Sequence, residues 1–278
     1  MRLIICTKRD YPGCYFLNRL LPHLAGHDVR VWLSNKTRPT ERSVPELAEI
    51  AFVERTLLTE QLFPLIDRLP NGASADAELA TFEGLKRRYG IPIDIVDDVR
   101  SPPAIAHLES LAPDLMISSR FSHIFKRNAI DVPRCGIVNL HPGALPHFAG
   151  LFAPMRTVNE GYGELTGTLH WIDEGIDTGP ILALRSRPLE RDTGLLSQVV
   201  EIYCDLIDPL LDMVRSIESG HCPEGIRQDT NTREYRSLPS EADLTSFHAT
   251  GMDFWKPAEL QQWIARFLPP DLRATPIL

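Results

Sequence analysis

The sequence lacks the marks of several broad protein classes. Its five cysteines are scattered and form no CxxC pair, so we expect small core residues rather than disulfides or a cysteine metal site. No apolar run approaches the ~18 residues of a membrane helix. The first residues, MRLIICTKRDYPG, carry charge too early for a secretory signal. We therefore expect a cytoplasmic protein that does not enter a membrane.

Positive charge is also scarce. The 278 residues include 29 Lys and Arg against 37 Asp and Glu, which gives a formal net charge of −8. Proteins that bind nucleic acid usually present a basic face, whereas the densest basic run here is LKRRYG at 85–90. A nucleic-acid partner is therefore not expected.

The common cofactor and metal signatures are missing as well. The first predicted strand is followed by TKRDYPG, which is not a glycine-rich phosphate cradle, and the glycines of GYGELTG at 161–167 have the wrong spacing for one. His141 and His147 are six positions apart across a proline-rich loop, and the chain has no HExxH or Cys/His set. The sequence gives no reason to expect a bound metal.

Strand-like and helix-like segments alternate along the first part of the chain. Apolar runs predict strands at 2–6, 28–34, 93–99, 114–119 and 136–141. Between them lie one helix closing at Gly26, one or two helices within 42–69, a helix capped near Ser74 or Asp76 and ending at Gly90, and a short helix over 102–113. This alternation predicts an α/β fold with a mostly parallel sheet, whose ligand would bind at the carboxyl ends of the strands.

The pattern changes after residue 165. Two strands flank the loop EGIDT, and a long helix over roughly 193–218 follows, with a kink expected at Pro209. Short helices are expected near 241–250 and 257–267. The fold class is thus α/β over 1–190, with a smaller, mainly helical or irregular section over 191–278.

An unusual pair of polar residues ends the strand GIVNLH. Side chains alternate along a strand, so Asn139 and His141 point to the same side, with Cα atoms about 7 Å apart. Pro142 and Gly143 then end the strand. The pair therefore lies where α/β folds usually place their chemistry.

Asn139 and His141 suit attack of a nucleophile on a carbonyl carbon. The amide can stabilise the developing oxyanion, and the imidazole can move a proton near neutral pH. No GxSxG motif or nearby cysteine offers an enzyme nucleophile, so the attacking group would belong to the substrate. A structural interpretation competes, in which the histidine is a satisfied core residue and the asparagine caps its own backbone.

A second stretch, LHWIDEGIDTGPIL at 169–182, supplies acids. It places Asp173, Glu174 and Asp177 in a loop between two strands, where an acid could orient the imidazole or favour its charged form. Asp-Thr-Gly also occurs in aspartic proteases, but Pro180 follows here and no second copy exists, so we reject that interpretation.

Together the two stretches resemble the folate-dependent formyltransferases, the family of the glycinamide ribonucleotide, methionyl-tRNA and sugar-nucleotide formyltransferases. The resemblance rests on Asn139-Leu140-His141-Pro142 at a strand end, Leu145-Pro146, Gly150, and Asp177-Thr178-Gly179 placed 38 positions after Asn139. It covers roughly residues 1–190, most densely 113–182.

The resemblance implies a Rossmann-like catalytic domain over 1–190 and 10-formyltetrahydrofolate as the formyl donor. By position, His141 would transfer protons, Asn139 would stabilise the oxyanion and Asp177 would assist His141. The segment SSRFSHIF lies where the family holds the folate, with core packing as the alternative for its two phenylalanines. The implied folate contacts are Phe121, Ser122, His123, Ile124, Phe125 and Asp173.

Several points depart from the family. Many members carry an Arg before the Gly of the loop after the Asn-x-His-Pro motif, whereas this chain has ALPHFAG. Region 35–92 is longer than a minimal member needs. Residues 191–278 show no pattern of a tRNA-binding barrel. We expect a small-molecule amine acceptor, either an amino-sugar nucleotide or an N-hydroxyornithine of the kind used in siderophores, and leave a homodimer open. Open alternatives are a formyltetrahydrofolate deformylase, a methionyl-tRNA formyltransferase-like enzyme and a non-catalytic folate-binding protein.

Overall fold

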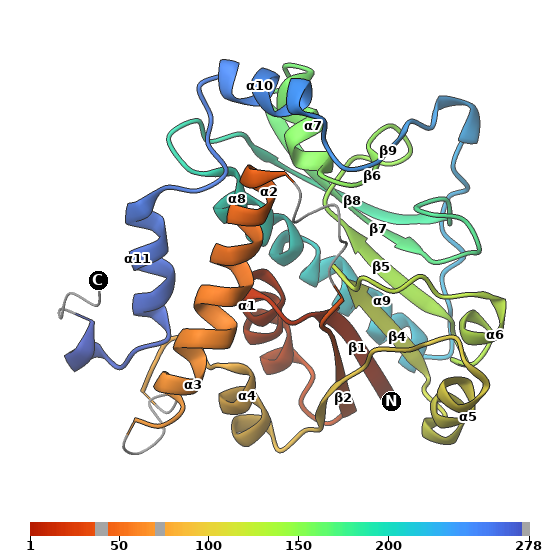
Figure 1. The fold of residues 1–278 in the computed structure, drawn as a ribbon. Helices are drawn as coiled ribbons and strands as arrows, with labels where there is room; N and C mark the ends of the chain where they lie inside the picture. Colours follow the sequence, from red (N-terminus) through yellow and green to blue (C-terminus); the bar gives the residue numbers. More distant parts are fainter. Residues whose placement is uncertain (37–43, 70–75, 274–278) are drawn as a thin grey trace.

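The fold is built around one mostly parallel sheet. The structure is a computed structural model that describes residues 1–36, 44–69 and 76–273 (Figure 1). Seven strands lie in the order β3-β2-β1-β4-β5-β7-β8. The first five of these pair in parallel, whereas β7 runs antiparallel to β5 and β8 antiparallel to β7. The strands are β1 Arg2–Lys8, β2 Asp28–Ser34, β3 Ile93–Ile95, β4 Leu115–Ser119, β5 Ile137–His141, β7 Glu164–Trp171 and β8 Ile181–Pro188. The predicted α/β class is confirmed.

Helices cover both faces of this sheet, and α1, α2, α3 and α11 gather on one side of it (Figure 1). They are α1 Tyr11–Leu20, α2 Pro45–Ala51, α3 Phe63–Ile66, α4 Phe82–Tyr89, α5 Pro102–Leu111, α6 Arg127–Ile130, α7 Ala153–Asn159, α8 Leu195–Asp205, α9 Ile207–Glu218, α10 Glu241–Ala249 and α11 Pro257–Arg266. A π-helix, η3 Phe52–Leu62, joins α2 to α3, and short 3-10 turns cover Leu21–His23, Thr230–Thr232 and Pro270–Leu272. A second small sheet pairs β6 Ala149–Gly150 with β9 Tyr235–Arg236.

Three predicted boundaries are corrected. Helix α4 is capped by the side chain of Thr81, which accepts from Gly84 N, rather than by Asp76; Ser74 lies outside the described residues. The strand expected over 93–99 ends at Ile95, since only Ile93–Ile95 pair with β2. The helix expected over 193–218 breaks at Leu206, and its proline falls in the first turn of α9, where a missing N–H costs little.

Residue alternation on β5 divides two cores. Val138 and Leu140 pack in the large cluster shared with α1, α8 and α9, whereas Ile137 packs in the smaller cluster near α5 and α6. The alternation expected from the sequence is therefore confirmed. Asn139 and His141 share the side of Ile137 and stand at the carboxyl end of the strand.

The section after residue 190 packs on the sheet domain. Trp263 of α11 stacks on Tyr11 of α1 with ring centroids 4.7 Å apart, and Phe267 lies 4.7 Å from Phe63. These rings belong to the same large cluster as the strand residues. The division of the chain at residue 190 stays a prediction.

Candidate active site

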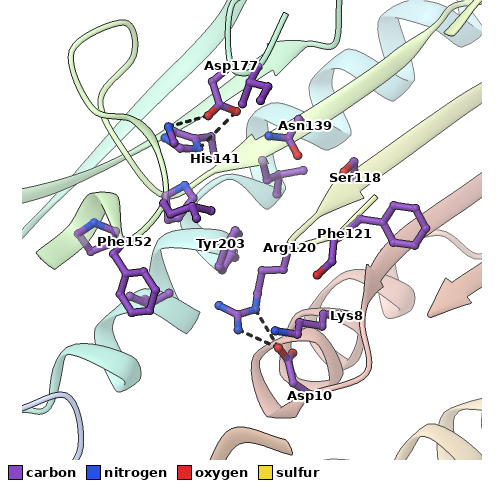
Figure 2. A pocket seen from close by; sticks show the side chains of 18 of the residues that line it. Lys8, Asp10, Ser118, Arg120, Phe121, Asn139, His141, Phe152, Asp177 and Tyr203 are labelled. Atoms are coloured by element: carbon purple, nitrogen blue, oxygen red, sulfur yellow. Dashed lines mark hydrogen bonds and ion pairs between the residues drawn. The ribbon is translucent and has the colours of Figure 1, made fainter. Parts of the chain in front are cut away.

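The polar residues predicted at the end of β5 line a cavity of about 360 Å³ at the carboxyl edge of the sheet. Figure 2 shows Asn139 and His141 at one end of this cavity, with Asp177 beside them. The cavity size is within the range of small-molecule sites. The structure thus brings the three predicted side chains together, although Asp177 lies 38 positions after Asn139 in the sequence.

His141 has a hydrogen-bond partner on one ring nitrogen and an acid near the other. It is 4% exposed, and its Nε2 lies 2.7 Å from the carbonyl oxygen of Phe148. A carbonyl only accepts, so Nε2 carries the proton and donates it. Nδ1 then faces Asp177, whose Oδ1 is 3.7 Å away. Nδ1 is therefore the nitrogen free to exchange a proton.

Asp177 is fixed by the backbone around it. It adopts a left-handed conformation with φ +55°, and its Oδ2 accepts from Gly150 N at 2.8 Å. Gln228 donates to the carbonyls of Asp177 and Gly179 at 3.1 and 2.7 Å. Gly150 itself has φ +97°, and a Cβ there would collide with the carbonyl of Arg236. The loop therefore aims the carboxylate at the imidazole without relying on the ligand.

His170 is a site residue that the sequence analysis did not assign. It pairs with Asn139 in the β5–β7 register, and its Nε2 lies 3.1 Å from Asn139 Nδ2. Its Nδ1 lies 2.8 Å from the carbonyl of Trp171 and so donates to it, which leaves Nε2 to accept from the amide. His170 thus fixes which end of Asn139 is the donor. The sequence signal was a histidine within an apolar strand.

Burial keeps His170 neutral, and this has a measurable consequence for stability. Burial lowers its pKa from 6.5 to about 4, although Asp177 opposes the shift. The unfolded state therefore binds a proton that the folded state excludes as pH falls from about 6.5 to about 4, and stability present above pH 6.5 is lost over that window. We expect about 3 kcal/mol of such loss at full titration.

The test compares wild type with His170→Gln in urea unfolding at several pH values. The stability advantage of wild type over the variant should shrink by about 3 kcal/mol between pH 6.5 and 4. Taking the difference between the two proteins removes the carboxylates that titrate in both. A difference that stays constant with pH would show that His170 binds its proton in the folded state.

The predicted folate segment follows β4 and lines the same cavity. Its five residues, Phe121, Ser122, His123, Ile124 and Phe125, all belong to the cavity wall, as does Asp173. Phe121 and Phe125 stack with centroids 5.6 Å apart, and Phe125 is buried in the smaller core cluster. The two phenylalanines thus both pack in or against the smaller core cluster and line the cavity.

Two details bear on what this wall can bind. Nε2 of His123 is buried and has no partner among the described residues, although the side chain lines the cavity. Burial lowers the pKa of His123, which favours the neutral ring. Asp173 has a different role within its loop, because its Oδ1 accepts from Gly175 N and Thr178 Oγ1 at 3.1 and 2.5 Å. An unpartnered ring nitrogen in a cavity wall fits a polar heterocycle.

A charged cluster that the sequence analysis missed occupies the other end of the cavity. Arg120 follows β4 with φ +59°. Its guanidinium lies 2.8 Å from Asp10 Oδ2 and 3.0 Å from Glu54 Oε2. Asp10 is 1% exposed and Glu54 6% exposed. Three charged side chains, from the β1–α1 connection, from η3 and from the residue after β4, thus lie together at the end of the cavity away from the predicted catalytic group (Figure 2).

The two carboxylates of this cluster titrate differently. Burial opposes ionisation of Asp10, but the charges of Arg120 and Lys8 hold its pKa below the ordinary value. Burial raises the pKa of Glu54, and the neighbouring Asp10 adds to the rise while Arg120 opposes it. One guanidinium therefore satisfies the first carboxylate better than the second.

A separate cluster has the residue types of a metal site. The donor atoms of His147, Glu160 and Glu234 lie within 4.8 Å of one another. The guanidinium of Arg236 already pairs with both acids, at 2.6 and 2.5 Å. One arginine thus already balances part of the negative charge of this cluster, and we assign no ion to it.

Among the described residues no helix is both long and apolar enough to cross a membrane.

Comparison with known proteins gives the same family as the motifs. Residues 96–194 match the formyl transferase family. A methionyl-tRNA formyltransferase of Halorhodospira halophila is 38% identical over 160 residues, which cover 56% of this chain and 51% of that protein. The chain spans about half the length of the curated relatives it matches, from 39% to 51% for the first three.

Solved structures share the fold at low sequence identity. A 4-N formyltransferase from Francisella tularensis matches with TM-score 0.56 and 13% identity, over 90% of this chain and 87% of that one. An N-formyltransferase from Helicobacter canadensis, solved with folinic acid and dTDP-3-aminofucose, matches with TM-score 0.52 and 17% identity, over 87% of this chain and 71% of that one. Residues 96–194 therefore match the formyl transferase family, within a Rossmann-like fold that the chain shares with solved formyltransferases.

Proposed function

We propose that the protein is a folate-dependent N-formyltransferase. It would move a formyl group from 10-formyltetrahydrofolate to an amine or hydroxylamine of a small metabolite, such as an amino-sugar nucleotide or N-hydroxyornithine. The observation that carries the proposal is the convergence of Asn139, His141 and Asp177 at one end of a cavity. The match of residues 96–194 to formyl transferases supports it.

The cavity wall fits a folate donor. The unpartnered Nε2 of His123 offers a hydrogen-bonding group to a polar ring, and Phe121 and Ile124 offer apolar surface around it. Two of the similar structures were solved with folinic acid or 5-N-formyl-THF. We therefore assign Phe121, Ser122, His123, Ile124, Phe125 and Asp173 to donor binding. The donor supplies a formyl group attached to a nitrogen that can leave.

The site residues then divide the work of the transfer. A new C–N bond forms between the acceptor nitrogen and the formyl carbon, and the bond from that carbon to the donor nitrogen breaks. Asn139, aligned by His170, donates to the formyl oxygen as negative charge develops on it. The acceptor nitrogen loses one proton and the donor nitrogen gains one, and His141 Nδ1, beside Asp177, is placed to carry it.

Water exclusion decides between transfer and hydrolysis. His141 and His170 are 4% and 2% exposed, so the reacting centre is accessible only through the cavity. A bound acceptor would displace water from it. Hydrolysis by a deformylase would require a water held in the same place, and the large apolar part of the cavity, with Leu195, Leu196 and Val199, fits an organic acceptor better.

The test measures tetrahydrofolate release from 10-formyltetrahydrofolate, first with water alone and then with a panel of amines. We expect release that depends on one class of small acceptor, with formylated product identified by mass spectrometry. Equal release without any amine would identify a deformylase. Release with methionyl-tRNA alone would identify an enzyme like the curated relatives. Neither release nor folate binding by calorimetry would overturn the proposal in favour of another role.

A further inference from the structure

The charged cluster at the far end of the cavity has alternating signs. Lys8 at the end of β1, Asp10, Arg120 and Glu54 all line the cavity. Figure 2 shows Arg120 between the Asn139–His141 end and the pair Lys8 and Asp10. Two cations and two carboxylates thus face the same space as the residues proposed to transfer the formyl group. These four side chains offer a ligand a binding surface, and their formal charges sum to zero.

Asp10 and Arg120, the central pair of the four, satisfy each other's charge. Asp10 Oδ1 accepts from Gly13 N at 2.9 Å and caps α1, and Oδ2 accepts from Arg120 Nη2 and Nε at 2.8 and 3.3 Å. The N-terminus of a helix after the first strand is where α/β folds commonly bind phosphate. In this chain a carboxylate already occupies that place. A phosphate there would meet a buried negative charge.

The other two residues of the cluster, Lys8 and Glu54, each keep an atom without a partner among the described residues. Glu54 uses Oε2 for Arg120, whereas its buried Oε1 has no partner among the described residues. The side chain is more than nine-tenths buried and lines the cavity. Lys8 makes no hydrogen bond or close ion pair with any residue that the structure describes, and its charge acts on Asp10 and Glu54 only at longer range. Within the described part of the chain, one cation and one acceptor atom of this cluster thus remain without a partner.

Building on the proposed function, we propose that the acceptor is a phosphate-free zwitterion, an α-amino acid whose side chain carries the nitrogen to be formylated. Lys8 binds its carboxylate and Glu54 Oε1 accepts from its α-ammonium. Arg120 stands between Lys8 and the Asn139–His141 end (Figure 2), and it pairs with Glu54. The aliphatic side chain of the acceptor therefore extends along Arg120 toward His141.

The apolar part of the cavity matches that aliphatic chain. Leu47 and Ile50 of α2, Leu196 and Val199 of α8, and Phe152 line the same space. A nucleotide or sugar phosphate would find only Lys8 as a cation of this cluster without a close partner among the described residues, since Arg120 pairs with two carboxylates. Burying a phosphate beside Asp10 and Glu54 would cost free energy through like-charge repulsion, which selects against such acceptors.

The first experiment measures kcat/KM for matched acceptors with the full chain and 10-formyltetrahydrofolate. The zwitterions are ornithine, lysine and their side-chain N-hydroxy forms. Each is compared with the diamine that lacks the carboxylate, with the amino acid that lacks the α-amine (1,4-diaminobutane and 5-aminopentanoate for ornithine), and with a dTDP-amino sugar. We expect a zwitterion to exceed every other probe by about 50-fold, with the formyl group on the side-chain nitrogen.

Two variants test the two proposed contacts separately, that of Lys8 with the α-carboxylate and that of Glu54 with the α-ammonium. Lys8→Met should abolish the preference for ornithine over 1,4-diaminobutane but keep the preference over 5-aminopentanoate. Glu54→Gln should abolish the preference for ornithine over 5-aminopentanoate but keep the preference over 1,4-diaminobutane. Both effects should appear mainly in KM. Lys8→Arg and Glu54→Asp keep the charges and should retain most of the discrimination, which separates recognition from misfolding. Lys86→Met and Glu83→Gln, both exposed on α4, serve as matched controls.

The outcomes distinguish this inference from the function on which it rests. Formylation of the dTDP-amino sugar in preference to the zwitterions, or formylation at the α-nitrogen, overturns the inference and leaves the formyltransferase proposal standing. Discrimination that the Lys8 and Glu54 variants leave intact also overturns it. Tetrahydrofolate release that no amine stimulates overturns both.

Discussion

Replacing His141 by Gln is expected to lower kcat by roughly 10² to 10⁴ while the protein keeps its fold. The amide of Gln can still donate to the carbonyl of Phe148, which His141 Nε2 reaches at 2.7 Å. What is lost is Nδ1, the nitrogen that faces Asp177 and can exchange a proton. Single-turnover formyl transfer with saturating donor and acceptor measures the effect on chemistry alone.

The interpretation of that loss depends on matched variants. His141→Ala should lose at least as much turnover and also some stability, because a buried carbonyl is left unpaired. His221→Gln changes an exposed histidine and should leave kcat within about twofold of wild type. If His141→Gln turned over at nearly the wild-type rate with an unchanged melting temperature, His141 would be a structural residue.

The part of the site that lies on β5 was predictable because it depends on local rules. Side chains alternate along a strand, so Asn139 and His141 had to share a side, and Pro142 had to end the ladder. Their closeness to Asp177 could not be derived in this way, because no local rule places a loop acid beside an imidazole that lies 36 positions earlier in the chain. That expectation came from the resemblance of the two motifs to a known family, and the 3.7 Å distance agrees with it.

The residues that the sequence did not reveal are those placed by register and helix packing. His170 faces Asn139 only because β7 runs antiparallel to β5 in one particular register, and a shift by one residue would turn it to the other side. Glu54 reaches Arg120 from a π-helix whose wider turn the sequence does not signal. Such contacts depend on free energies summed over the whole core, so no short motif encodes them.

The same reasoning explains why acceptor identity was left open. The wall that we assign to the donor follows β4 directly in sequence, as SSRFSHIF, and could be found by position. The opposite wall combines β1, η3, α8 and the residue after β4, which are far apart in the chain. Charges that are unremarkable singly in the sequence, such as Asp10 and Glu54, acquire meaning only once burial has removed them from water.

Asp177→Asn is expected to reduce kcat by roughly 10² or more, although the side chain changes little in size. The remaining amide oxygen can still accept from Gly150 N, which holds Oδ2 at 2.8 Å, so the loop should keep its shape. The negative charge beside His141 Nδ1 and His170 Nε2, 3.7 and 3.9 Å from Oδ1, is what disappears. Without it an imidazolium that forms during proton transfer loses its counterion.

The control and the pH dependence make this result specific. Glu174→Gln removes an acid three positions away on the same loop, exposed and paired with Arg127 at 3.0 Å, and should retain nearly full activity. Since Asp177 raises the pKa of His170, Asp177→Asn should also lower the pH at which His170 takes up its proton in a ¹H–¹⁵N NMR titration. Normal turnover together with that NMR shift would mean that Asp177 acts on His170 alone, and the transfer chemistry would then have to proceed through His141 and Asn139 without an acid.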